Sequence, residues 1–287
     1  MEAHQRSLWH LHLSVLLFGG TALFAKLIPL PALDITVLRC LIAALTLALV
    51  VKVQGQRLTL ASVQDYLTAV ALGVIVSLHW ATYFASMQVA SVAVGIIAFF
   101  TYPVMTVLLE PLLDRHWPAA RDLGAAVLVL LGIYLLSPHW QLDNNTTQGV
   151  ALGILSAFLF TLRNLLHKRR FSQYSGPKAM FYQTLIAMLV LAPMMQENPA
   201  QLGSHGWSLL VLLGVVFTAA PHALLAQVLG RLKVKTVALI SCLQPLYASA
   251  LAALVLHEIP NWHTVAGGVL VVSAAIYETV AARRQSP

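Results

Sequence analysis

The chain has 287 residues, of which 59% are hydrophobic and only 9% are charged. Because soluble domains carry about 25% charged residues, this composition excludes a soluble protein, and apolar runs long enough to cross a bilayer as helices recur from end to end. A net charge of +7 would suggest nucleic acid as the partner of a soluble protein, but here the basic residues are distributed in a way that predicts no nucleic-acid partner.

Both cysteines, Cys40 and Cys242, lie inside apolar runs, which excludes a disulfide framework and a cysteine-based metal site. We predict neither a bound metal nor a cofactor. The first apolar run starts near Leu8, is followed by Lys26 and by further apolar runs, and shows no small-residue cleavage site. We interpret it as a retained helix and not as a signal peptide.

Breaks marked by Pro, Gly, Asn and charged residues divide the chain into ten predicted spans, numbered 1 to 10 in chain order. Their approximate limits are 8–28, 34–53, 65–87, 90–112, 119–137, 148–168, 176–195, 206–229, 234–256 and 261–281. The predicted fold class is an all-α integral membrane protein with ten transmembrane helices in a multi-pass arrangement.

The basic residues predict the orientation of these spans. Lys26, Arg39 and Arg163 fall within spans, and the other fourteen of the 17 Lys and Arg residues lie at the termini, in loops or at the adjoining span ends. All fourteen lie on one side of a ten-span arrangement. Since that side is expected to be cytoplasmic, we predict a plasma (inner) membrane protein with both termini in the cytoplasm.

An internal repeat divides the chain into halves. Residues 123–136 resemble residues 266–279 at an offset of 143, and the segments around Pro103 and Pro245 align at an offset of 142. The predicted units are residues 1–143 and 144–287, each with five helices. Because five is odd, the second half lies inverted relative to the first, an arrangement typical of secondary transporters that bind solute between the repeats.

Several stretches carry a resemblance to a known family. They are LLFGGTALFAKL in span 1, ITVLRCLIAAL in span 2, the proline-containing segments of spans 4 and 9, and QPLYASALAALVLHEIP at residues 244–260. Along nearly its whole length the chain resembles the EamA-type proteins of the drug/metabolite transporter (DMT) superfamily. It departs from them at LLDRHWP in the first half, where a Gly-Glu-Arg-like turn is common.

This resemblance implies two inverted five-helix repeats around a central cavity lined mainly by spans 1, 3, 4, 6, 8 and 9. It also implies solute movement without ATP, usually as export. The sequence itself contains no Walker motif for nucleotide binding.

Polar and aromatic residues recur at helical spacing on one face of spans 3, 4, 6, 8 and 9. Such groups are expensive in hydrocarbon and usually face a bundle interior or a cavity. The candidate solute-binding residues drawn from or beside these faces are His79, Trp80, Tyr83, Phe99, Tyr102, Asn164, His222 and Gln244. The aromatic members have two interpretations, as walls for a ring or an organic cation and as ordinary packing.

His79 and His222 lie near mid-depth, one in each half of the chain. Because an unperturbed histidine titrates near neutral pH, both are candidates for proton coupling or for hydrogen bonding to the solute. The alternative is a neutral histidine bonded to a neighbouring helix. A metal role is disfavoured because no carboxylate or cysteine lies at ligand spacing beside them.

Glu110 is the one carboxylate clearly inside a predicted span and is the third proton-coupling candidate. The structural alternative pairs it with Arg163, at similar depth in span 6, or lets both side chains snorkel to the interface. Lys26 and Arg39 are interpreted in the same way, by snorkelling or by a pair with Asp34, with solute contact as the alternative. Pro103 and Pro245 are candidates for gating breaks in the helices or for tolerated kinks.

The leading hypothesis is a secondary transporter that exports small metabolites, such as amino acids or related compounds, or drug-like solutes, with proton coupling as a further hypothesis. The alternative is a membrane protein without transport, either a sensor or an intramembrane enzyme. The sequence leaves the oligomeric state open, because the small-residue face from Gly149 to Gly153 suits dimerisation and packing within one chain equally well.

The predicted orientation is tested by cysteine labelling in intact cells. We expect an impermeant thiol reagent to modify a cysteine placed at Asn144 from outside, and one placed at Ser172 only after the membrane is opened. The reverse pattern would overturn the orientation.

Overall fold

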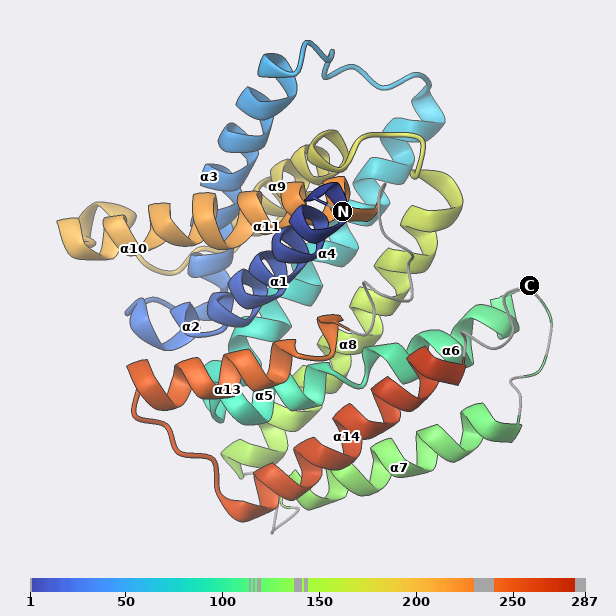
Figure 1. Cartoon of the computed structure of the whole chain (residues 1–287). Helices are drawn as coiled ribbons and strands as arrows, with labels where there is room; N and C mark the ends of the chain where they lie inside the picture. The colour runs from blue at the N-terminus through green and yellow to red at the C-terminus, as the bar shows by residue number, and fades with distance from the viewer. Residues whose placement is uncertain are drawn as a thin grey trace.

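The computed structural model describes residues 2–113, 115, 117, 120–136, 141, 144–229 and 240–281. Within these residues the regular structure is helical throughout, without a strand. Figure 1 shows two crossing groups of helices joined by the long helices α4 and α8, which run through both groups.

The helices of the first half follow the predicted spans closely. They are α1 (Glu2–Thr21), α2 (Phe24–Leu27), α3 (Ala32–Val53), α4 (Val63–Val89), α5 (Val92–Phe99), α6 (Tyr102–Leu113) and α7 (Ala120–Leu136). Spans 1 and 4 are each divided in two, into α1 with α2 and α5 with α6.

The second half shows the same correspondence. Its helices are α8 (Asn145–Arg170), α9 (Gly176–Leu191), α10 (Ser204–Gly214), the π-helix η3 (Val215–Ala219), α11 (Ala220–Leu229), α13 (Gln244–Val255) and α14 (Trp262–Ala281), with short 3₁₀ turns η1 (Ala192–Met194) and η2 (Pro199–Gln201). Span 8 therefore consists of α10, η3 and α11. The first part of span 9 lies outside the described residues.

Six helical stretches are long and apolar enough to cross a membrane. They are Gln5–Leu27, Ala32–Val53, Val63–Val89, Val92–Leu113, Asn145–Arg170 and Ser204–Leu225, and shorter apolar helices cover Leu123–Leu136, Gln244–Val255 and Trp262–Tyr277. Large apolar side chains such as Leu45, Leu49 and Leu130 remain exposed on their outer faces. Such a surface is stable in lipid, and the protein is a multi-pass membrane protein.

Polar side chains mark where several helices begin. The hydroxyls of Ser62 and Ser91 accept hydrogen bonds from the first-turn N–H groups of α4 and α5, and Asn144 does the same for α8. These N–H groups have no partner inside their own helix, and a polar side chain just before the helix satisfies one of them. The breaks inferred from polar residues are thus helix caps.

Spans 4 and 9 are interrupted in the same way. In span 4, residues 100–101 form a turn between α5 and α6; in span 9, residues 242–243 form a turn before α13. Thr101 N donates to Ala98 O and Met105 N to Thr101 O, while Leu243 N donates to Ile240 O and Tyr247 N to Leu243 O. The two sets differ by 142 positions throughout, and Pro103 and Pro245 each follow the break by two residues.

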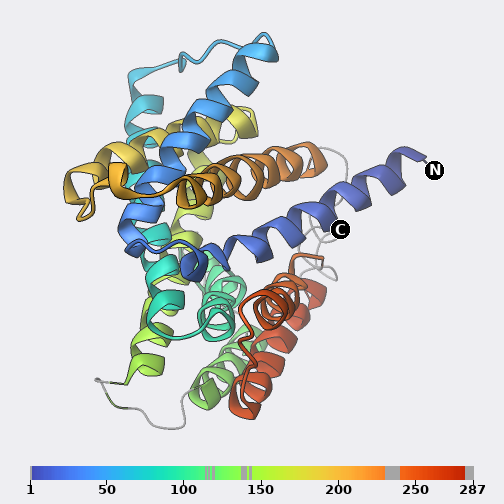
Figure 2. The same ribbon diagram turned by 90° about the vertical axis from the view of Figure 1, so that its left-hand side faces the viewer.

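Close helix contacts depend on glycine. α4 packs against α8, α3 against α9, and α7 against α14, the last pair lying side by side in both views (Figures 1 and 2). Gly149 and Gly153 of α8 face Ala90 and Ala98, so the small-residue face is used for packing within the chain. In the α7–α14 pair, a Cβ atom at Gly267 would lie 2.5 Å from the carbonyl oxygen of Gly132.

This contact generates a prediction about stability. Gly267→Ala forces α14 away from a backbone atom of α7, and overpacking of this kind lowers the free energy of unfolding by about 1–3 kcal/mol. Gly124→Ala is the matched control, since a Cβ atom there meets nothing within 4 Å and alanine favours the helix by up to about 1 kcal/mol. Thermal unfolding of the purified variants measures both, and equal melting temperatures would contradict the prediction.

Candidate functional site

A group of aromatic rings occupies the junction of α4, α5, α6 and α8. Phe99, at the end of α5, lies 5.1 Å from Tyr102 at the start of α6 and 5.3 Å from Phe160 of α8, measured between ring centroids. Tyr83 of α4 meets Phe99 edge-on at 5.2 Å, and Tyr102 meets Phe160 at 5.0 Å. Phe99 and Tyr102 are three residues apart and lie on the same side of span 4, although the turn at residues 100–101 separates α5 from α6.

His79 of α4 completes this group. It is 4% exposed, and its ring stacks on Phe99 at 5.5 Å and lies 5.0 Å from Phe160. Its Nδ1 atom lies 2.8 Å from the hydroxyl and 3.1 Å from the carbonyl oxygen of Ser156, whose hydroxyl donates to the backbone of His79. A carbonyl only accepts, so Nδ1 carries the hydrogen, and Nε2 remains available as an acceptor.

His222 of α11 is held in a similar way. Its Nδ1 atom donates to the carbonyl oxygen of Thr218, 2.7 Å away, one turn earlier. Thr218 belongs to the π-helix η3, which directly precedes α11, and Pro221 has no N–H to donate to that preceding turn. The hydroxyl of Thr21 in α1 supplies a donor instead, 2.8 Å from the carbonyl oxygen of Phe217. Both histidines thus have Nδ1 committed to a helix and no hydrogen bond at Nε2 among the described residues.

Trp80 connects the two histidines. Its ring lies 6.5 Å from that of His79 and 6.3 Å from that of His222, between ring centroids. The ring of His222 also meets that of Phe18 in α1 edge-on, at 4.9 Å between ring centroids. The site therefore joins side chains of spans 1, 3, 4, 6 and 8, drawn from both halves of the chain.

Arg39 of α3 lies over the same tryptophan. The guanidinium carbon is 4.2 Å from the centre of the Trp80 ring and 4.9 Å from that of Phe84. Arg39 is only 2% exposed, and its Nε atom has no hydrogen-bond partner. The two structural interpretations of Arg39, snorkelling and a pair with Asp34, are therefore wrong, and solute contact stays a prediction. Asp34 instead accepts the backbone N–H groups of Gln196 and Glu197.

Arg163 of α8 has neutral partners. It donates to Gln183 at 2.7 Å, to Asn164 at 2.9 Å and to the sulfur of Met180 at 3.1 Å. Asn164 is thus held by its own neighbour, and its availability to a solute is reduced. Met180 belongs to the apolar cluster that contains Trp80, so Arg163 lies behind the same wall of the site.

Glu110 does not pair with Arg163. Its carboxylate lies 2.7 Å from the ammonium group of Lys168, and the two side chains are 38% and 72% exposed respectively. The suggested Glu110–Arg163 pair was wrong because Lys168, one turn further along α8, reaches the same carboxylate. Lys26 is satisfied elsewhere, by the carbonyl oxygens of Gln88 and Ala90.

Gln244 lies apart from the ring group. It is the first residue of α13, which packs against α1 and α5. In the part of the chain that the structure describes, its side chain forms no hydrogen bond with the other candidate residues. No group of three His, Cys, Asp or Glu side chains suited to a metal ion occurs among the described residues either.

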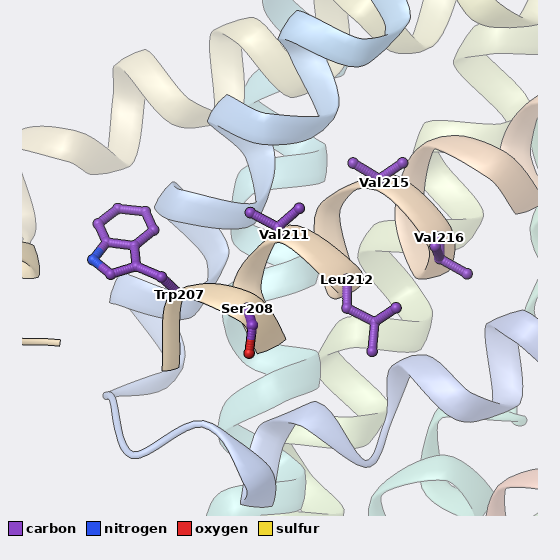
Figure 3. Close-up of a pocket in the computed structure, with 6 residues that line it drawn as sticks. All are labelled: Trp207, Ser208, Val211, Leu212, Val215 and Val216. Carbon is purple, nitrogen blue, oxygen red and sulfur yellow. The ribbon is translucent and has the colours of Figure 1, made fainter. Parts of the chain in front are cut away.

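An open pocket of about 480 Å³ lies elsewhere, along α10 and η3 (Figure 3). It is lined by Trp207, Ser208, Val211, Leu212, Val215 and Val216. Its apolar lining suits a hydrocarbon chain and offers a polar solute one hydroxyl.

Some features of the site were missed from the sequence. Phe18 and Phe160 contact the histidines but were not among the predicted binding residues, although Phe160 shares a helical face with Ser156. The signal for Arg39 was its position well inside span 2, five residues beyond Asp34. An arginine at that depth is expensive to place in lipid and favours the bundle interior.

Comparison with known proteins identifies the family. The EamA-like transporter family matches the chain twice, over residues 6–137 and 147–277. The chain belongs to the EamA-like transporter family. It is a membrane transporter of the DMT type and not an enzyme, in agreement with the resemblance seen in the sequence.

Relatives with curated names are also transporters. The chain is 25% identical to the uncharacterized transporter YxxF of Bacillus subtilis, over 95% of this chain and 88% of the relative. It is 23% identical to the uncharacterized inner membrane transporter YicL of Salmonella typhimurium, over 100% of this chain and 99% of the relative. It is 26% identical to the pseudopaline exporter CntI of Pseudomonas aeruginosa, over 86% of each chain.

A crystal structure of a protein with 17% sequence identity aligns with a TM-score of 0.66 over 99% of both chains. This likeness shows a shared fold.

Proposed function

We propose that this EamA-like transporter exports a small metabolite across the inner membrane and binds it at the junction of α4, α5, α6, α8 and α11. The observation that carries the proposal is that two histidines from different halves flank Trp80, and that one of them, His79, also stacks on Phe99. Neither histidine has a hydrogen bond at Nε2 among the described residues. Ligand sites of this kind combine apolar and aromatic walls with a few directed polar groups.

The division into residues 1–143 and 144–287 as inverted repeats is part of the proposal. Its support is the hydrogen bonding at the two helix breaks, which repeats at an offset of 142. Equivalent helices also pack on each other, as α3 does on α9 and α7 on α14. A two-fold axis between the halves relates the two helices of each such pair to each other. In transporters of this type the solute site is expected close to that axis.

The breaks supply a means of opening the site. The rings of Phe99, Tyr102 and Phe160 lie within 5.3 Å of one another and fill the junction in this conformation. A solute enters only when these rings separate. Ahead of Pro103 and Pro245, the N–H groups of Thr101 and Leu243 bond to the carbonyl oxygen three residues back and not four, and these turns act as the gating positions.

His79 and His222 are the proposed carriers for proton coupling. Both rings keep an acceptor nitrogen near the solute position, while the other nitrogen is held by Ser156 of α8 for His79 and by the carbonyl oxygen of Thr218 for His222. Glu110 is a weaker candidate, because it is half-exposed and paired with Lys168 outside the ring group. The orientation with both termini in the cytoplasm follows from the basic residues and remains part of the same proposal.

Transport is tested with purified protein in liposomes loaded with a small-molecule extract of bacterial cells. We expect mass spectrometry to detect the release of a limited set of solutes, at a rate that an imposed pH gradient changes. His222→Ala should abolish this pH dependence and reduce release about tenfold, the effect of losing one hydrogen bond of about 1.4 kcal/mol.

Two comparisons make the result specific. Glu110→Gln removes a carboxylate outside the ring group and should keep the pH dependence; its loss in this variant alone would assign the proton to Glu110. Liposomes without protein control for leakage. Equal release from protein-containing and empty liposomes, for every solute and in both directions of the pH gradient, would refute the transport function proposed for this site.

A further inference from the structure

Arg39 is a buried cation without an anion. It lies well inside α3, is 2% exposed and has no carboxylate within 4.0 Å among the described residues. Its guanidinium contacts the faces of Trp80 and Phe84, and its Nε atom donates no hydrogen bond. Buried charges in proteins are normally paired and hydrogen-bonded, so a permanent partner is missing here.

Four carboxylates of the described residues are engaged elsewhere. Asp34 accepts backbone N–H groups of residues 196 and 197, and Glu258 accepts that of Val92. Asp65 is bonded to Ser62 and Tyr174, and Glu110 to Lys168. None of these carboxylates lies within salt-bridge distance of Arg39, so an anion that meets Arg39 has to come from outside this set.

Arg163 provides a contrast within the same region. Its three nitrogen atoms all have neutral partners from α8 and α9, at 2.7–3.1 Å. An arginine that serves structure alone is satisfied in this way. Arg39 has the thiol of Cys40 and two aromatic faces as its neighbours; the aromatic faces hold the cation in place by cation–π attraction, and its Nε–H is left for another acceptor.

Arg39 also faces the ring group of the proposed site. It lies 4.2 Å from the centre of the Trp80 ring, and that ring contacts both His79 and His222. Beyond Trp80 the walls are the neutral rings of Tyr83 and Phe99. Arg163 lies behind the same wall but is satisfied by neutral partners, so Arg39 is the cation that offers a free donor beside neutral and aromatic walls. This arrangement matches a solute with a single negative group attached to an apolar or ring-containing body.

We propose that Arg39 binds a carboxylate of the transported solute, and that the substrate class is therefore metabolites with a carboxylate and an apolar or ring-containing body. This inference rests on the transport function proposed above. The planar guanidinium fork suits a carboxylate, which accepts two parallel hydrogen bonds. While the site is empty, Trp80 and Phe84 hold the guanidinium in the position that the carboxylate approaches.

The experiment uses the full chain in liposomes loaded with the bacterial extract, and identifies every released solute by mass spectrometry. We expect the released solutes to carry a carboxylate. Arg39→Met should reduce their release about tenfold or more, because one charge-assisted hydrogen-bond pair is lost. Arg57→Met, the same substitution at an exposed loop arginine, is the matched control and should release solutes at the parental rate.

A second measurement separates a role of Arg39 in binding the solute from a role in stabilising the fold. The primary amide of each released acid has the same body without the charge, and it should compete with the acid at least about tenfold less well in the parent. Arg39→Met should also melt at or above the parental temperature, because replacing a buried unpaired charge with an apolar side chain of similar size is neutral or stabilising. Arg39→Gln is the second neutral variant.

Several results would overturn this inference while leaving transport intact. They are release of solutes without an acidic group, equal competition by acid and amide, and parental release from Arg39→Met. Failure of both Arg39→Met and Arg39→Gln to fold would assign Arg39 a structural role and overturn it as well. Absence of release of any solute by the parent would refute the proposed function itself, and this inference with it.

Discussion

Hydrocarbon offers no hydrogen bonds, so each polar group in the membrane has to find its partner within the protein. The chain meets this demand with neighbouring helices. The hydroxyl of Thr21 donates to the carbonyl oxygen of Phe217, which has no helical donor because Pro221 lacks an N–H. The hydroxyl of Ser86 donates to the carbonyl oxygen of Gly149 at 2.6 Å. These contacts permit helix breaks and a π-helix at membrane depth. Against this background Arg39 stands out, since its charge has no counterpart among the described residues.

Helical spacing and a helix break meet at the proposed site. Phe99 and Tyr102, three residues apart on either side of the turn at residues 100–101, share one face, where His79 and Phe160 meet them from α4 and α8. The corresponding turn at residues 242–243 has matching hydrogen bonds. A chain that interrupts the same span of both halves can exchange one set of contacts for its symmetric equivalent, and this is the physical basis of alternating access in the proposed mechanism.

Hydropathy and helical spacing predicted much of this structure. The spans were visible because lipid demands long apolar helices, and the faces of His79, Ser156 and Phe160 were visible because residues three or four apart share one side of a helix. Spacing does not show which neighbouring helix a face meets or how far a long side chain reaches. The structural interpretations of Arg39, snorkelling or a pair with Asp34, therefore failed, and so did the suggested Glu110–Arg163 pair, because Lys168 reaches the carboxylate of Glu110. The π-helix at Val215–Ala219 depends on contacts with α1 that no local pattern reveals.

The decisive measurement is an experimental structure of the protein with its transported solute bound. We expect density for the solute between α4, α5, α6, α8 and α11, with its acidic group at hydrogen-bond distance from Arg39 and its body against Trp80. The rings of Phe99, Tyr102 and Phe160 should be further apart than the 5.0–5.3 Å seen here. A solute bound in the apolar pocket along α10, beside Trp207 and Val211, with the ring group unchanged, would contradict the proposed site.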